Sequence, residues 1–174
     1  RRRSEMDSET FSLLLYACGM GRDETRLLEA RAAMAQVVAR EPRFHFARAL
    51  LALDGAIANQ SAPAPMRTRL RDSARADAGR VLRADPGIGE SYIALSLLET
   101  HGNWAARENL LRQGLAHDQI NGALNTHYAA LLSELGRVAE ALPYARRAVM
   151  LDPLSRPKRR AVAHLLLLNG DADE

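Results

Sequence analysis

The residue types that could carry chemistry do not converge into a recognisable catalytic or metal-binding motif in this 174-residue chain. No two histidines are spaced as HxxxH around a glutamate, and none adjoins a cysteine, whereas a zinc site needs about four converging ligands. No GxxxxGK[ST] or GxGxxG phosphate loop and no GxSxG serine motif is present. The histidines are His45, His101, His117, His127 and His164. The sequence therefore predicts a protein that is not an enzyme, without catalytic residues, metal ligands or a cofactor.

The charged and sulfur-containing residues set further limits. Lys158 is the only lysine among 24 basic residues, and this arginine bias fits a GC-rich bacterial genome. A net charge of +3 is too small for a dedicated nucleic-acid binder, so we expect no direct nucleic-acid binding. The single cysteine, Cys18, excludes an intramolecular disulfide and is expected to be a small buried residue. No apolar run is long enough to cross a membrane. Because the chain starts at Arg1 and not at Met, we expect a piece of a longer protein.

Two basic clusters and one tryptophan could form partner contacts. Arginines recur every four residues at Arg67, Arg71 and Arg75; a solvated outer face, with acidic residues nearby, is favoured over a docking face for an acidic partner or nucleic acid. Trp104 is expected to pack at a turn, the alternative being an exposed partner anchor.

The second cluster comprises Arg156, Lys158, Arg159 and Arg160. It is read as a solvated helix start, although it could bind anions or an acidic protein surface. Positive charge at a helix N-terminus opposes the helix dipole, so a compensating partner is expected there.

The elements that must position these residues repeat along the chain. Acidic-proline pairs at Glu41-Pro42, Asp85-Pro86 and Asp152-Pro153 each follow an apolar, arginine-bearing helical stretch, and Gln119 takes the place of the proline in between. Pro86 to Gln119 is 33 residues and Gln119 to Pro153 is 34, the period of a helix-turn-helix repeat. Pro42 to Pro86 is 44 residues, and we assign the excess to a mobile inserted loop over residues 58–67.

The repeat at residues 122–155 has the expected physical features of a helix pair. Leu131, Leu132 and Leu135 give the first helix an apolar stripe at helical spacing, and Gly136 ends it. Pro153 ends the second helix because it lacks an N–H and clashes with the preceding turn.

Two segments resemble tetratricopeptide (TPR) repeats: GRVAEALPYARRAVMLDP is similar to the second helix of the family, and HGNWAARENLLRQGLAHDQ to the preceding repeat. Arg107, where the family prefers alanine, and Gln119 depart from its pattern. The resemblance implies an all-α fold, a right-handed superhelical array of antiparallel helix pairs spanning residues 1–174 as one domain. The repeats are expected at 7–42, 43–86 with the inserted loop 58–67, 88–119 and 121–153, followed by a capping helix at 156–169.

The resemblance also implies a concave face lined by the first helix of each repeat, which binds a peptide or helix of another protein. The residues expected on this face are Phe46, Ala49, Leu53, Ile93, Leu97, Thr126, His127, Ala130, Arg160 and His164. They do not match the Lys/Arg/Asn set of the TPRs that clamp chaperone tails, and their apolar character favours helix-in-groove binding. A small-molecule effector-sensing module is the alternative.

The combination of GNW with ELGRVAEALPYARRAVMLDPLS is similar to the C-terminal TPR region of bacterial multidomain transcriptional regulators and cyclases. It implies a signalling role in which this domain is the sensory or interaction module. The cytoplasm is the expected compartment, and the periplasm is the alternative if a membrane segment precedes residue 1.

Overall fold

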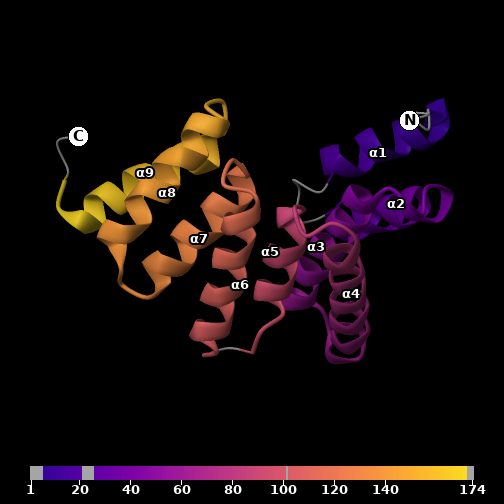
Figure 1. Cartoon of the computed structure of the whole chain (residues 1–174), viewed down its shortest axis with the longest axis horizontal. Helices are drawn as coiled ribbons and strands as arrows, with labels where there is room; N and C mark the ends of the chain where they lie inside the picture. Colours follow the sequence, from indigo (N-terminus) through magenta and orange to yellow (C-terminus); the bar gives the residue numbers. More distant parts are fainter. Residues whose placement is uncertain (1–5, 21–25, 101, 172–174) are drawn as a thin grey trace.

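The computed structural model describes residues 6–20, 26–100 and 102–171, and within these ranges it contains nine α-helices and no strand (Figure 1). The helices are α1 (Ser8–Met20), α2 (Leu27–Arg40), α3 (His45–Ser61), α4 (Ala64–Ala84), α5 (Gly89–Leu97), α6 (Trp104–His117), α7 (Gly122–Glu134), α8 (Val138–Leu151) and α9 (Arg156–Asn169). The predicted all-α fold class is confirmed.

Consecutive helices pack in pairs along the array, α1 with α2, α3 with α4, α5 with α6 and α7 with α8, while α9 lies on α8 (Figure 1). The acidic residue of each repeat ends the second helix of its pair. The Asp85 N–H donates to the Val81 carbonyl at 2.8 Å, and the Asp118 N–H donates to the Gly114 carbonyl at 2.9 Å. About four helix pairs plus a capping helix therefore form the molecule.

The core is made of leucine and alanine. Between α3 and α4 the buried side chains are mainly alanines, including Ala52, Ala56, Ala74 and Ala78. In the C-terminal half, larger side chains such as Leu124 fill the space between helices. Small residues let helix backbones approach closely, and alanine also has the highest helix propensity, so one residue type serves both local structure and packing.

Two glycines allow α7 to sit against α5 and α6. A Cβ atom built on Gly89 would lie 2.5 Å from Leu124 Cδ1, and one built on Gly114 would lie 2.8 Å from Leu124 Cδ2. No real side chain tolerates such distances. The absence of side chains at both positions therefore creates the socket that holds Leu124.

The predicted inserted loop at 58–67 is wrong. Helix α3 continues to Ser61 and α4 starts at Ala64, so the extra residues lengthen two helices to 17 and 21 residues. Ala58 and Ala62 are buried in a cluster with Leu70. The prolines misled the prediction: Pro63 precedes α4 and Pro65 lies in its first turn, where a missing N–H costs nothing.

Cys18 also differs from expectation, because its side chain is exposed. Helix α1 packs on α2 through one face, on which Ala17 is buried, and Cys18 lies on the other. Helix α5 ends at Leu97, and His101 lies outside the described residues.

Candidate protein-binding grooves

A groove of about 280 Å³, here called the inner groove, lies between α7 and α9 over α8. Helix α7 supplies Thr126, Ala129, Ala130, Ser133 and Glu134; α8 supplies Ala145 and Ala148; α9 supplies Lys158, Ala161, His164 and Leu165. Five of these eleven residues are alanines, and their short side chains leave the space between the helices open.

The position of α9 creates the inner groove. Helix α9 rests on α8 through Val162, Leu165 and Leu166, and Leu165 is its one buried residue. Residues at i, i+3 and i+4 share a helix face, so Ala161, His164 and Leu165 project together toward α7. The apolar side chains of α9 are thus partly covered by α8.

Most polar groups that line the inner groove already have partners. The Thr126 hydroxyl donates to the Gly122 carbonyl at 2.8 Å, Lys158 Nζ pairs with Asp152 at 3.0 Å, and Glu134 pairs with Arg107 at 3.1 Å. The groove therefore presents an apolar floor of alanines with few free donors or acceptors. Lys158 with Asp152 is also part of the compensation expected for the basic start of α9.

The structure brings three predicted concave-face residues, Thr126, Ala130 and His164, together in the inner groove. The prediction is wrong for Ala49 and Ile93, because both side chains have a relative exposure of 0% and belong to the core. Their neighbours in the array cover both side chains, so neither can touch a partner.

The other predicted residues lie elsewhere. Phe46 is 42% exposed near the start of α3, with its ring 6.3 Å from that of Phe44. Leu53 and Leu97 are half-buried against the core. Arg160 is exposed on α9 but does not line the inner groove.

His127 is half-buried and also does not line the inner groove. Burial, and then the charge of Arg107, lowers the pKa of His127 to about 4. The imidazole is therefore neutral at pH 7. It takes up a proton less readily than a solvated histidine does.

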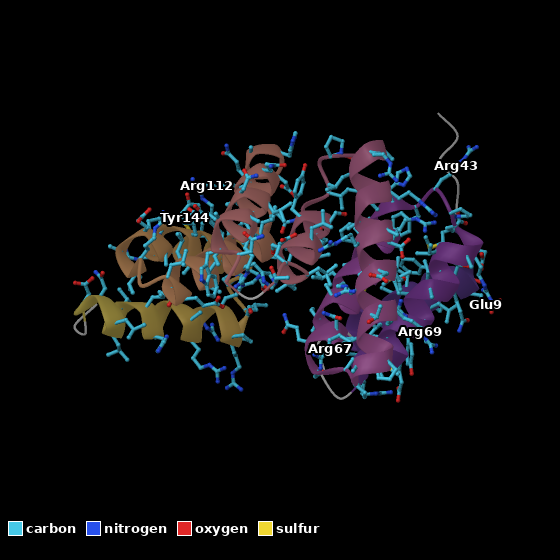
Figure 2. The ribbon with its side chains drawn as sticks, turned by 90° about the horizontal axis from the view of Figure 1, so that it is seen from below. Glu9, Arg43, Arg67, Arg69, Arg112 and Tyr144 are labelled. Atoms are coloured by element: carbon cyan, nitrogen blue, oxygen red, sulfur yellow. The ribbon has the colours of Figure 1, made fainter. Side chains whose placement is uncertain are left out.

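A second groove, of about 1060 Å³ and here called the edge groove, was not predicted. One side of it is formed by the end of α3 and the start of α4. The other side is formed by the end of α5, the start of α6 and the end of α7. Its charged residues are Arg67, Arg71, Glu99, Arg107 and Glu134, and it also contains Asn59, Leu97 and Trp104. In Figure 2, Arg67 lies on the side of α4 that faces the C-terminal helices, whereas Arg69 points to the other side.

The edge groove changes the interpretation of two sequence features. Arg67 and Arg71 line a groove and are not simply on a solvated outer face, and Arg75 donates to the Leu98 carbonyl at 3.2 Å. Trp104 is 37% exposed at the first position of α6, with the Arg107 guanidinium 5.0 Å from its ring centroid. The four-residue arginine spacing was the signal that could have revealed this groove.

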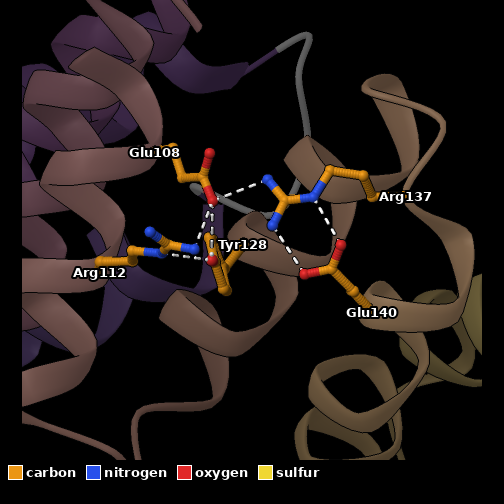
Figure 3. Close-up of polar contacts among 5 residues, drawn as sticks. All are labelled: Glu108, Arg112, Tyr128, Arg137 and Glu140. Carbon is orange, nitrogen blue, oxygen red and sulfur yellow. Dashed lines mark hydrogen bonds and ion pairs between the residues drawn. The ribbon is translucent and has the colours of Figure 1, made fainter. Parts of the chain in front are cut away.

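Between α6, α7 and α8, five side chains form a polar network that the sequence analysis missed (Figure 3). Glu108 accepts hydrogen bonds from Tyr128 at 3.2 Å and Arg137 at 2.8 Å, and pairs with Arg112 at 2.9 Å. Arg137 also pairs with Glu140 through two bonds, of 2.8 and 2.7 Å. The network connects side chains of two successive repeats, and its charges are paired with one another. Its role is therefore to stabilise the packing of these repeats.

The arrangement of helix pairs is similar to that of several solved structures. A thermophilic TPR protein of Thermus thermophilus, TTC0263, has a TM-score of 0.71 at 20% identity over 92% of this chain and 82% of its own. Two structures of MamA have TM-scores of 0.54 and 0.53, each at 14% identity, over 88% and 96% of this chain and 84% and 86% of their own. The chain has a TPR fold.

A TPR array typically serves as a protein-protein interaction scaffold and is usually noncatalytic. A scan against protein-family models and a search of curated proteins found no match. Within residues 6–20, 26–100 and 102–171, no three His, Cys, Asp or Glu side chains are grouped as metal ligands would be, and no helix is long and apolar enough to cross a membrane.

Proposed function

We propose that this TPR domain is an interaction scaffold that binds an apolar helix or peptide of a partner protein in the inner groove. The observation that carries the proposal is the alanine-lined space between α7 and α9, open to solvent and bordered by paired polar groups. A partner side chain that enters it loses contact with water and leaves no buried polar group of the groove floor unpaired.

The shape of the inner groove favours a helix or peptide with small or medium apolar side chains. Ala130 and Ala161 lie on opposite walls and are exposed, so they would contact the partner directly. An amphipathic helix presents such side chains at i, i+3, i+4 and i+7, which is the usual mode of helix-in-groove recognition.

We further propose that the domain is the interaction module of a larger bacterial regulatory protein. Support comes from the resemblance of residues 102–155 to the C-terminal TPR regions of multidomain transcriptional regulators and cyclases. In such a protein, partner binding in the inner groove would transmit a signal to the attached domain.

The test uses substitutions that block the groove without disturbing the core. Ala130→Asp and Ala161→Asp place a carboxylate on each wall, at exposed positions. Ala139→Asp, on the exposed side of α8, is the matched control. A photo-crosslinking residue at position 130 or 139, used in native bacterial lysate, identifies the partner segment by mass spectrometry.

We expect an apolar helical segment of one protein to be crosslinked from position 130 and not from 139. Its binding should be lost with Ala130→Asp and Ala161→Asp and kept with Ala139→Asp. A partner that both groove variants retain would refute the proposal. A saturable thermal shift with a metabolite, blocked by the same two variants, would instead support the effector-sensing alternative.

A further inference from the structure

We propose that the edge groove, which shares only Glu134 with the inner groove, is a second docking surface and that it binds an acidic segment of a partner protein. The occupant is defined by charge complementarity. Two arginines, one without an ion pair among the described residues and one with only an exposed ion pair, lie beside exposed apolar surface in this groove.

The carboxylates in the edge groove are already paired with arginines, whereas Arg67 has no ion pair among the described residues and Arg71 has only an exposed one. Glu134 pairs with Arg107 at 3.1 Å, and Glu99 with Arg75 at 3.7 Å. Arg67 directs its guanidinium to the Ala62 carbonyl, at 3.0 and 3.2 Å, and forms no ion pair with any residue that the structure describes.

Among the residues that the structure describes, Arg71 pairs with the adjacent Asp72 alone, at 3.4 Å, and the two side chains are 49% and 66% exposed. Such an exposed pair is weak. Arg67 and Arg71 are four residues apart on α4 and so project from the same face. Together they offer positive charge to a partner carboxylate.

The other charged residues of α4 add to the positive charge of Arg67 and Arg71. It carries six arginines but only two acidic residues, and one of these, Asp77, is held by Arg48 at 2.9 Å in a largely buried pair. A basic helix with so little internal compensation attracts acidic ligands over a distance of about 10 Å at moderate salt.

Two further features favour a peptide over a nucleic acid. One is the apolar surface of Trp104 and Leu97, on which a peptide side chain can pack. The other is the arrangement of charge: Glu99 and Glu134 occupy Arg75 and Arg107, so Arg67 and Arg71 are the cations left for an anionic ligand. A peptide can place its carboxylates at these two arginines alone, whereas a continuous phosphate backbone carries a charge at every nucleotide.

The experiment measures fluorescence anisotropy of a labelled peptide in which glutamate and leucine alternate. The same peptide with glutamine in place of glutamate, and a single-stranded oligonucleotide of equal charge, are the comparison ligands. The double variant Arg67→Gln/Arg71→Gln removes both of these cations. The matched control, Arg80→Gln/Arg83→Gln, makes the same charge change at exposed positions of α4 that do not line the groove.

We expect saturable binding of the glutamate peptide that is weakened at least about tenfold by Arg67→Gln/Arg71→Gln and changed less than about twofold by the control. Arg71→Glu alone, at an exposed position, tests the same point if the double variant melts early by circular dichroism. Three results would overturn the proposal: no saturable binding by the parent, equal losses in both double variants, or tighter binding of the oligonucleotide.

Discussion

At the scale of single residues, the Glu108 network shows how a partly buried carboxylate is kept ionised. Burial alone would raise the pKa of Glu108, but hydrogen bonds from Arg137 and Tyr128 and the charge of Arg112 hold it below its ordinary value. A carboxylate with three donors around one oxygen is stabilised in its charged form. Its pairing therefore contributes stability that is present at neutral pH.

Replacing Glu108 by glutamine should lower the free energy of unfolding at pH 7 by about 1 kcal/mol, because the amide loses charge-assisted bonds in a partly solvated site. The deficit should shrink as pH falls below about 4.5, where the unfolded carboxylate takes up a proton and the parent loses this contribution. Urea unfolding from pH 3 to 7 measures both effects. Glu29→Gln, which removes an exposed pair with Arg26 at 3.4 Å, should change stability by less than about 0.5 kcal/mol. Equal effects of the two substitutions would contradict the structural role of Glu108.

His127 gives a pH dependence of its own. Burial and then Arg107 lower the folded pKa from 6.5 to about 4, so the unfolded chain binds the proton first as the solution is acidified. The free energy of unfolding should therefore fall as pH drops from about 6.5 to about 4. His127→Gln should flatten this slope, measured by urea unfolding at intervals across that range.

His164→Gln, at an exposed position, is the control and should keep the parent slope. Burial, partly offset by the charge of Arg31, raises the pKa of Asp54 to about 6, which makes a slope of the opposite sign. That contribution is common to all three proteins and cancels in the comparison. An unchanged slope in His127→Gln would show that His127 is solvated.

At the scale of helices, the Leu124 socket fixes how the third and fourth repeats meet. Gly114→Ala and Gly89→Ala should each lower the free energy of unfolding by about 1–3 kcal/mol, because the new methyl group overlaps Leu124. Gly79→Ala in α4 should instead raise it by about 0.5–1 kcal/mol, since its Cβ would meet only Arg83 Nη1, at 3.5 Å. Chemical denaturation measures all three. A stabilising Gly114→Ala would mean that α6 and α7 are farther apart than described.

Helix boundaries were predictable from the sequence where a glycine or proline was compatible with only one local structure. The predicted capping helix at 156–169 coincides with α9, and α7 and α8 end just before Gly136 and Pro153, as predicted. Pro63 and Pro65 were compatible with two local structures, a loop or the start of a helix. The choice depended on whether Ala58 and Ala62 are buried, which is a tertiary fact absent from local sequence.

The predicted exposure of Ala49 and Ile93 was wrong for a similar reason. The resemblance located the first helix of each repeat, but the exposure of Ala49 and Ile93 depends on how far the neighbouring helices cover them. Thr126, Ala130 and His164 line the inner groove because α9 is the last described helix beside them. The edge groove was missed because it joins five helices whose ends are distant in the sequence.

The helical nature of residues 58–67 leads to an element-scale prediction. Deleting them should unfold the N-terminal half, because the deletion removes buried Ala58 and Ala62 together with the Arg67 bonds to the Ala62 carbonyl. Inserting Gly-Ser-Gly between Ala62 and Pro63 should cost less than about 1 kcal/mol, since a longer connection adds little closure entropy. Thermal melting by circular dichroism compares the two. A deletion as stable as the insertion would restore the loop interpretation.

At the scale of the whole molecule, each helix pair contacts mainly its neighbours, so stability in an array of this kind is a sum of local terms. The two grooves lie at different points of that array, the inner groove between α7 and α9 and the edge groove where α4 meets the ends of α5, α6 and α7. Glu134 is common to both linings, so two partners bound at once would approach each other at this residue. The affinity of each groove for its partner would depend on the stability of the repeats that form it.

Hydrogen exchange can test this local coupling. Leu165 is the one buried residue of α9, so Leu165→Ala should free α9 and speed amide exchange in α9 and α8. Exchange in α2 and α3 should change little, because α9 packs mainly on α8. Mass spectrometry of peptides from both halves gives the comparison, with exposed Leu168→Ala as the matched control. Faster exchange throughout the chain would instead show that the array unfolds as one unit, in which case a partner in the inner groove would also stabilise the edge groove.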